Sequence, residues 1–204
     1  MSDLAARFGQ VLAGRRIEAI VIGASAGGVD ALVELLPALP TGGKLAAVCI
    51  LHVPADRESR LAELFDARLD LPVREATDKE SLMPGTLYFA GAGYHLSIET
   101  DRVFSLSCEP PVHYARPAID VLMESAADAY GAGLAGILLT GANADGAEGM
   151  QRIRQRGGLT VVQDPNEAQA STMPEKAIRL CAPHLVLPLA DIRALLPLLE
   201  TTTP

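Results

Sequence analysis

Short runs of apolar residues alternate along the chain with segments whose apolar residues have helical spacing. The apolar runs have the length of strands and lie at residues 17–22, 44–52, 134–140, 159–163 and 185–189. The segments with helical spacing lie at residues 29–39, 56–68, 118–130, 146–156, 173–178 and 191–200. A strand that is apolar along its whole length is covered on both faces, so the alternation predicts a parallel sheet between layers of helices.

Residues 84–107 depart from this alternation. They contain short, partly alternating runs joined by Gly-rich or charged turns, and the last two, YHLSIET and DRVFSLS, are typical of a hairpin. A short run at 72–76 adds a further strand. We therefore predict one doubly wound α/β domain over residues 17–204, mostly parallel, with an antiparallel hairpin at the edge of the sheet. Residues 1–16 before it have the composition of a short polar helix or arm.

The composition narrows the class of protein. Of 204 residues, 49% are hydrophobic and 21% are charged, which is enough apolar material for a sizeable core. The net charge of −8, with no cluster of Lys and Arg, disfavours nucleic-acid binding. The 3 cysteines are far apart and odd in number, which fits neither a zinc site nor a disulfide framework. No apolar segment has the length of a signal peptide core or a membrane span, so we expect a cytoplasmic protein without membrane insertion.

Polar residues of three different kinds follow three of the predicted strands. Ser25 lies in GASAGG after the first strand, His52 ends the second, and Asp145 lies in GANADGAEG after the strand at 134–140. Ligands of open parallel sheets bind outside the carboxyl ends of the strands. If these strands are neighbours, a nucleophile, a base and an orienting carboxylate converge at one rim.

Each of these residues also has a simpler interpretation. The spacing Gly-x-Ser25-x-Gly matches a nucleophile elbow, but an anion-binding glycine loop or a plain helix cap has a similar composition. The turn lacks both the G-x-G-x-x-G pattern and the Lys of a phosphate loop. Asp145 is placed to cap the helix that follows it, and Asp164 is a rival carboxylate. The 4 histidines are scattered over different elements, which disfavours a metal site.

Six segments carry a resemblance to a known family. In order, they are VIGASAGGVDAL, ILHVPAD, PGTLYFAGAGYHL, ARPAIDVLMESAA, GILLTGANADGAEGMQRIRQRGGLTVVQD and TMPEKAI. Together they resemble the catalytic domain of the CheB family, the chemotaxis protein-glutamate methylesterases. The resemblance implies that Ser25 is the nucleophile, His52 the base and Asp145 the orienting acid. It also implies hydrolysis of glutamate methyl esters, or deamidation of glutamines, on cytoplasmic helices of methylated chemoreceptors, with no metal or cofactor.

The backbone N–H groups of Ala26, Gly27 and Gly28 are the oxyanion donors that we expect. The chain departs from the family pattern at this site, because Ala26 replaces a Thr and Ala142-Asn143 replaces Met-Gly after the L-T-G motif. We expect these positions to line the pocket, so the reaction type is better determined than the substrate preference.

Arginines near the expected site are candidates for substrate binding. Arg57, Arg60 and Arg116 are candidates to meet glutamates that flank the substrate on the receptor, and the alternative is that they are plain surface charges. Two other functions stay open at this point. One is a serine hydrolase or amidase for a different acyl substrate, and the other is a non-catalytic signalling module of the same fold.

Regulation is a further expectation from the sequence. Many members of the family carry a phosphorylatable receiver domain before the catalytic domain. Only 16 residues precede the first predicted strand here, and only TTTP follows Glu200. The sequence therefore predicts that phosphorylation of this chain does not control its activity, which is constitutive or set by a partner such as a separate receiver protein.

Overall fold

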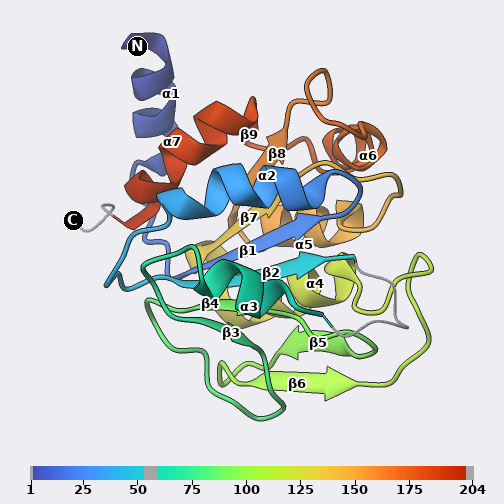
Figure 1. Ribbon diagram of the computed structural model, residues 1–204. Coiled ribbons are helices and arrows are strands. Elements are labelled where there is room, and N and C mark those ends of the chain that lie inside the picture. Colours follow the sequence, from blue (N-terminus) through green and yellow to red (C-terminus); the bar gives the residue numbers. More distant parts are fainter. Residues whose placement is uncertain (1, 53–58, 201–204) are drawn as a thin grey trace.

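The computed structural model describes residues 2–52 and 59–200, and a parallel sheet forms its centre (Figure 1). Across these ranges, 7 strands form one sheet in the order β3-β4-β2-β1-β7-β8-β9, with parallel neighbours throughout. Its strands are β1 (Ala19–Ala24), β2 (Ala46–Leu51), β3 (Val73–Glu75), β4 (Leu87–Phe89), β7 (Leu134–Leu138), β8 (Leu159–Gln163) and β9 (Leu185–Leu187). The predicted doubly wound parallel sheet is thus confirmed.

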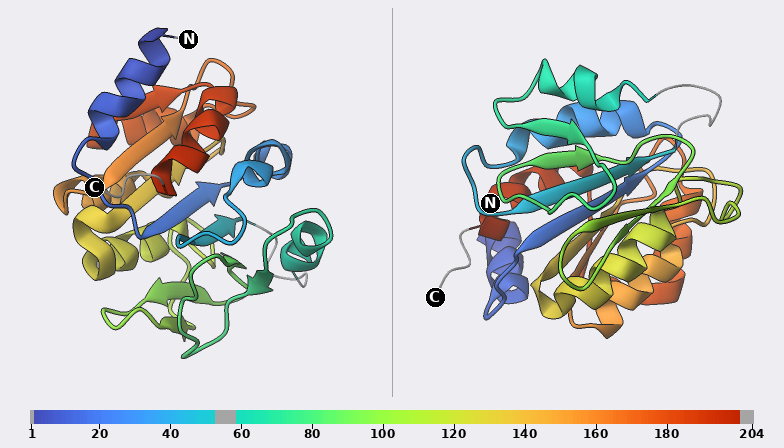
Figure 2. Two further views of the ribbon diagram at one scale, coloured as in Figure 1. Left: turned by 90° about the vertical axis from the view of Figure 1, so that its left-hand side faces the viewer. Right: turned by 90° about the horizontal axis from the view of Figure 1, so that it is seen from below.

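Helices cover both faces of the sheet, as Figure 2 shows from two further directions. They are α1 (Ser2–Leu12), α2 (Gly28–Leu35), α3 (Leu61–Asp66), α4 (Ile119–Tyr130), α5 (Ala147–Gln155), α6 (Thr172–Cys181) and α7 (Leu189–Glu200), with 3₁₀ turns at Leu36–Ala38 and Gly131–Gly133. Helices α1, α2, α3 and α7 share one apolar core with the sheet, whereas α4, α5 and α6 share a second core on its other face. Each residue of β1 is buried, because its side chains enter the two cores alternately.

The order of the strands creates a crevice beside β1. From β1 the chain continues to β2 and then to β3 and β4 on the same side of the sheet. It then returns across the sheet, and β7 pairs with the opposite side of β1. In open parallel sheets, the carboxyl ends of strands at such a switch point form the usual place for a ligand. The ends of β2, β1 and β7 therefore define the part of the fold where a site is expected.

The region from 84 to 107 differs from its expected arrangement. Leu87–Phe89 is not antiparallel at the edge, but pairs in parallel with β2 and β3 inside the main sheet. All residues of β4 are buried, and burial on both faces suits an internal parallel strand. The predicted hairpin forms from β5 (His95–Ile98) and β6 (Phe104–Ser107), which make a separate antiparallel sheet that packs against α4. The hairpin therefore covers a helix and does not extend the sheet.

Two helices differ in detail from their predictions. The first helix is less polar than expected, because Phe8 and Leu12 are buried in the core on the α1 side. The predicted helix at 56–68 overlaps α3, although residues 53–58 lie outside the described part. In the described ranges, no helix is both long enough and apolar enough to cross a membrane.

Candidate active site

The turn that carries Ser25 joins the end of β1 directly to the start of α2. The Ser25 N–H donates to the Thr140 carbonyl at 2.9 Å, and the Ser25 carbonyl accepts the Gly28 N–H at 2.7 Å. Gly27 has a φ of 78°, a left-handed conformation that residues with a side chain rarely adopt. A Cβ on Gly28 would lie 2.4 Å from the Leu51 side chain, so the close approach of α2 to β2 requires glycine. The small residues around Ser25 are therefore needed for the path of the backbone.

His52 follows the neighbouring strand β2 and lies between Ser25 and Asp145. Its backbone N–H donates to the Ala24 carbonyl at 3.2 Å, which extends the pairing of β1 with β2 by one residue. Its Nδ1 lies 3.1 Å from Ser25 Oγ, and its Nε2 lies 2.7 Å from Asp145 Oδ2. The His52 side chain is 13% exposed and that of Asp145 is 0% exposed, so little water competes for these hydrogen bonds.

The hydrogen bonds determine which nitrogen of His52 is free to accept a proton. An ionised carboxylate only accepts hydrogen bonds, so Nε2 carries the proton, and this N–H donates a hydrogen bond to Asp145. The lone pair of Nδ1 then faces Ser25, whose hydroxyl donates to it. Chymotrypsin-type proteases use the opposite assignment, with Nε2 as the base and Nδ1–H on the carboxylate. Either nitrogen can take the proton of a serine, because triads are defined by geometry and roles.

Asp145 is held by the start of α4 as well as by His52. Its Oδ2 accepts the Ile119 N–H at 2.7 Å, and its Oδ1 accepts the Asp120 N–H at 2.9 Å. The residue before α4 is Ala118, which has no capping side chain, so Asp145 satisfies the first N–H groups of this helix. Burial favours a higher pKa for Asp145, but the hydrogen bonds from His52, Asp120 and Ile119 outweigh it and hold the pKa below its usual value. The carboxyl is therefore ionised at neutral pH.

The alternatives considered from sequence occupy other positions. Asp145 caps α4 and not the helix that follows it, since α5 begins after Gly146 without a side-chain cap. Asp164 lies at the end of β8, where its Oδ1 accepts hydrogen bonds from the backbone and the side chain of Asn166. It therefore stabilises its own turn.

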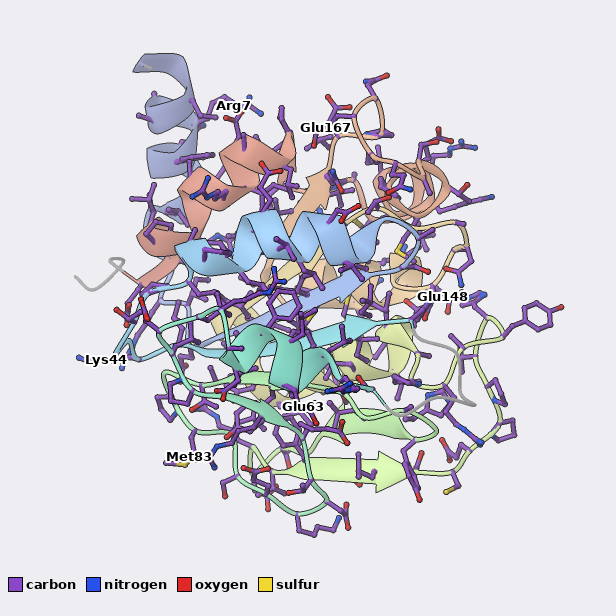
Figure 3. All side chains as sticks on the ribbon, in the orientation of Figure 1. Arg7, Lys44, Glu63, Met83, Glu148 and Glu167 are labelled. Atoms are coloured by element: carbon purple, nitrogen blue, oxygen red, sulfur yellow. The ribbon has the colours of Figure 1, made fainter. Side chains whose placement is uncertain are left out.

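Figure 3 shows Glu148, three residues after Asp145, at the end of the molecule where β1, β2 and β7 terminate, and Lys44 at the opposite end.

Thr140, which the sequence analysis did not select, supports the Ser25 turn. Its side chain is buried, and its Oγ1 donates to the Ala26 carbonyl at 2.8 Å. The Ala26 carbonyl and the Gly27 N–H belong to one planar peptide and point in opposite directions, so this bond fixes the direction of the Gly27 N–H. The signal was available, since Thr140 follows an apolar strand just as Ser25 and His52 do.

The expected oxyanion donors are not equivalent. The Gly28 N–H already donates to the Ser25 carbonyl, which leaves it unavailable to a substrate. Within the described ranges, no protein acceptor binds the N–H groups of Ala26 and Gly27. Both lie in the turn just after Ser25, where an oxyanion of a Ser25 adduct would form.

The predicted substrate-binding residues are in several environments. Arg57 lies outside the described residues. The Arg116 guanidinium donates to the carbonyls of Cys108 and Glu109, and so it holds the loop before α4. Ala142 is exposed and Asn143 is half-buried, both beside Asp145, whose N–H donates to Asn143 Oδ1 at 3.2 Å. Arg60 forms an exposed ion pair with Glu63.

Other reactive groups lie away from these residues or are buried. Burial raises the pKa of the Cys49 thiol, which is fully enclosed in β2, so this cysteine belongs to the core. Among the described residues, no group of 3 or more His, Cys, Asp and Glu side chains is arranged to hold a metal ion. The arrangement that remains is Ser25, His52 and Asp145 at the switch point, which has the geometry for acyl transfer.

The sequence and the fold both match one family of hydrolases. The family model described as CheB methylesterase matches residues 20–196. The crystal structure of the Thermotoga maritima CheB methylesterase catalytic domain superimposes with a TM-score of 0.83 and 30% sequence identity, over 89% of this chain and 98% of that chain. Fold and site together define a hydrolase built on a doubly wound parallel sheet. The chain belongs to the CheB methylesterase family, which confirms the resemblance predicted from its motifs.

Two curated relatives illustrate the range of lengths in this family. A putative protein-glutamate methylesterase/protein-glutamine glutaminase of Leptospira interrogans is 42% identical over 178 residues, which is 87% of this chain and 92% of the relative. A protein-glutamate methylesterase/protein-glutamine glutaminase of Methanospirillum hungatei is 39% identical over 176 residues, which is 86% of this chain but 50% of the relative. This chain therefore spans nearly all of one relative and half of the other.

Replacing Thr140 with Val tests its support of the Ser25 turn. The variant keeps the shape of the side chain but loses the hydroxyl bond to the Ala26 carbonyl, so the Gly27 N–H is held less firmly. A lost hydrogen bond of about 1 kcal/mol corresponds to roughly a fivefold to tenfold loss of turnover on an ester substrate. The measurement is kcat at saturating substrate, with the thermal midpoint as a check of folding.

Thr160→Val is the matched control for Thr140→Val. Thr160 is also a buried strand residue whose hydroxyl is hydrogen-bonded, in this case to His184 at 2.9 Å. It lies near the start of β8, away from the carboxyl ends. The control should lose stability without losing kcat, and equal kcat values for the two variants would contradict the role of Thr140.

Proposed function

We propose that this chain hydrolyses glutamate methyl esters on the cytoplasmic helices of chemoreceptors and releases methanol, with Ser25, His52 and Asp145 as its catalytic triad. The names of the relatives support the reaction and its substrate class. The observation that carries the assignment of residues is the position of His52, which is 3.1 Å from Ser25 Oγ and 2.7 Å from Asp145 Oδ2.

The first half of the reaction transfers the glutamyl group to Ser25. His52 Nδ1 takes the Ser25 proton as Oγ attacks the ester carbonyl, and the resulting imidazolium is stabilised by the Asp145 carboxylate. The N–H groups of Ala26 and Gly27 bind the negative oxygen of the tetrahedral intermediate. His52 then gives its proton to the leaving methoxide, which departs as methanol. The acyl-enzyme remains.

The second half restores the enzyme. His52 Nδ1 takes a proton from water, whose oxygen attacks the acyl carbonyl, and Ser25 leaves with the proton returned from His52. The product is a free glutamate side chain. The same steps act on a glutamine side chain with ammonia in the place of methanol, in agreement with the glutaminase in the names of the relatives.

The surroundings of the site suit a neutral substrate on an acidic receptor. A methyl ester is uncharged, so the net charge of −8 does not oppose its entry. In this proposal, Arg57 and Arg116 contact carboxylates that flank the ester on the receptor, and Ala142 and Asn143 line the pocket. Because the substrate helices lie in the cytoplasm, the enzyme works there. Control by a separate receiver protein stays a prediction.

Ser25→Ala tests the nucleophile. Alanine fits the small-residue turn, so the variant should fold normally but release no methanol, since it has no oxygen to form the acyl-enzyme. The measurement is methanol release from a methylated receptor fragment, compared with the wild-type chain. A folded Ser25→Ala protein that retains a tenth of wild-type turnover would sink the assignment. Hydrolysis of simple esters without release from the receptor would indicate a different acyl substrate.

Asp145→Asn tests the orienting acid. The amide group of Asn places an N–H donor where the carboxylate accepts the N–H groups of His52, Ile119 and Asp120, so one of these bonds is lost and His52 is misplaced. The equivalent change in a chymotrypsin-type triad lowers turnover roughly 10⁴-fold. We expect a loss on the order of 10²-fold or more here. Asp164→Asn is the control and should keep normal turnover; the reverse outcome would show that Asp164 is the orienting acid.

A further inference from the structure

A carboxyl group near the start of each of the helices α4 and α5 accepts backbone N–H groups at the start of the other helix. Asp145, just before α5, accepts the first N–H groups of α4, as described above. In return, Asp120 in the first turn of α4 accepts the Gly149 N–H of α5 at 2.7 Å through its Oδ1. Neither helix has a capping side chain at its own N-cap, because these positions are Ala118 and Gly146. These bonds bring the carboxyls of Asp120 and Asp145 together between the two helix starts.

The two carboxyls are not equally satisfied. Asp145 accepts three hydrogen bonds, from His52, Ile119 and the backbone of Asp120. Asp120 is 4% exposed, and its buried Oδ2 has no hydrogen-bond partner among the described residues. His113 Nε2 lies 3.4 Å from this oxygen, which is too far for a good hydrogen bond. Because two adjacent buried carboxylates repel each other, the pair keeps one proton, and the less satisfied group binds it.

We propose that Asp120 is a positioning residue whose protonated form donates a hydrogen bond to Asp145. This inference rests on the proposed function, in which Asp145 orients His52. The neutral Asp120 acid adds a fourth donor to the Asp145 carboxylate and keeps the negative charge of the pair on the residue that faces His52. Its Oδ1 continues to accept the Gly149 N–H, so both of its polar atoms are then used.

The surrounding charges agree with this assignment. Burial raises the pKa of Asp120 to about 7; the Gly149 N–H opposes this rise, whereas the charge and hydrogen bond of Asp145 and the charge of Glu148 add to it. Among the described residues, the ionisable groups around Asp120 are Asp145 just before α5, Glu148 in its first turn, His113 in the loop before α4, and His95 of β5, which accepts the neighbouring Ala118 N–H. Glu148 is labelled in Figure 3.

The proposal predicts that the ionisation of Asp120 affects the site. When Asp120 loses its proton, a second negative charge lies beside Asp145, and Asp145 loses the hydrogen bond from the Asp120 acid. Asp145 then holds His52 less firmly, so kcat/KM should fall as Asp120 ionises near pH 7. Asp120→Asn copies the neutral acid, since its amide donates to Asp145 and its oxygen accepts from Gly149. The pH profile of kcat/KM in this variant should lack that fall.

The pH dependence of stability gives an independent test of the protonation of Asp120. The folded-state pKa of Asp120, about 7, lies above its unfolded value of 3.8. The stability that it contributes is therefore complete below about pH 4 and is lost as the pH rises through about 7. The Asn side chain does not ionise, so Asp120→Asn should not lose stability in this way. Its thermal midpoint should therefore rise relative to the wild type between about pH 4 and about pH 7 and level off above this range.

The experiment compares Asp120→Asn and Asp120→Ala with the wild-type chain, with Asp128→Asn as control. Asp128 lies on the same helix but is paired with Arg152 and Arg156 at the surface, so its change should leave the pH profile unaltered. The readouts are the ¹³C NMR titration of the Asp120 carboxyl, the pH profile of methanol release, and thermal midpoints. At neutral pH, Asp120→Asn should keep turnover within about threefold, whereas Asp120→Ala should lose on the order of tenfold or more.

Three results would overturn the proposal: an Asp120→Asn protein as inactive as Asp120→Ala, a fall of kcat/KM near pH 7 that persists in Asp120→Asn, or normal turnover in Asp120→Ala. If Asp120→Ala fails to fold, the pH profile and turnover of Asp120→Asn still decide the question. The NMR titration needs no substrate. A wild-type chain that releases no methanol would therefore contradict the proposed function while leaving the test of Asp120 intact.

Discussion

The bonds of the Asp145 carboxylate are the constraint on which the rest of the site depends. One carboxyl accepts the N–H groups at the start of α4 and the Nε2–H of His52. It thereby joins the loop after β7, the helix α4 and the residue that follows β2. The helix supplies rigid donors and a favourable dipole for the charge, and the charge in turn fixes the ring of His52. The residue that caps α4 is thus also the residue that holds His52.

The sheet brings the remaining parts to the same rim. β1 lies between β2 and β7, so Ser25 emerges between His52 and the loop of Asp145. Thr140 at the end of β7 then binds the turn of Ser25 through its carbonyl and its hydroxyl. Side chains from three parallel strands therefore converge without any long loop to hold them, which explains how a small-residue turn can place the Ser25 hydroxyl beside His52.

Much of this arrangement could be predicted from the sequence because its signals are local. Continuous apolar runs indicated the buried strands, and polar residues at their ends indicated Ser25, His52 and Asp145. What the sequence did not reveal depends on contacts between distant segments. Leu87–Phe89 enters the main sheet because it is buried on both faces, and its short run did not show this. The hydrogen bond between Asp120 and Gly149 depends on how α4 packs against α5, which no spacing rule encodes.

The central claim is that Asp145 holds His52 with Nε2 protonated and Nδ1 free to act as the base. The ¹⁵N NMR spectrum of His52 measures this directly, because the two ring nitrogens report separately which of them carries the proton. Neutral His52 is expected to carry its proton on Nε2 and to have an unprotonated Nδ1, and this preference should be lost in Asp145→Asn. A neutral His52 protonated at Nδ1 in the wild-type chain, or a tautomer that does not respond to Asp145→Asn, would contradict it.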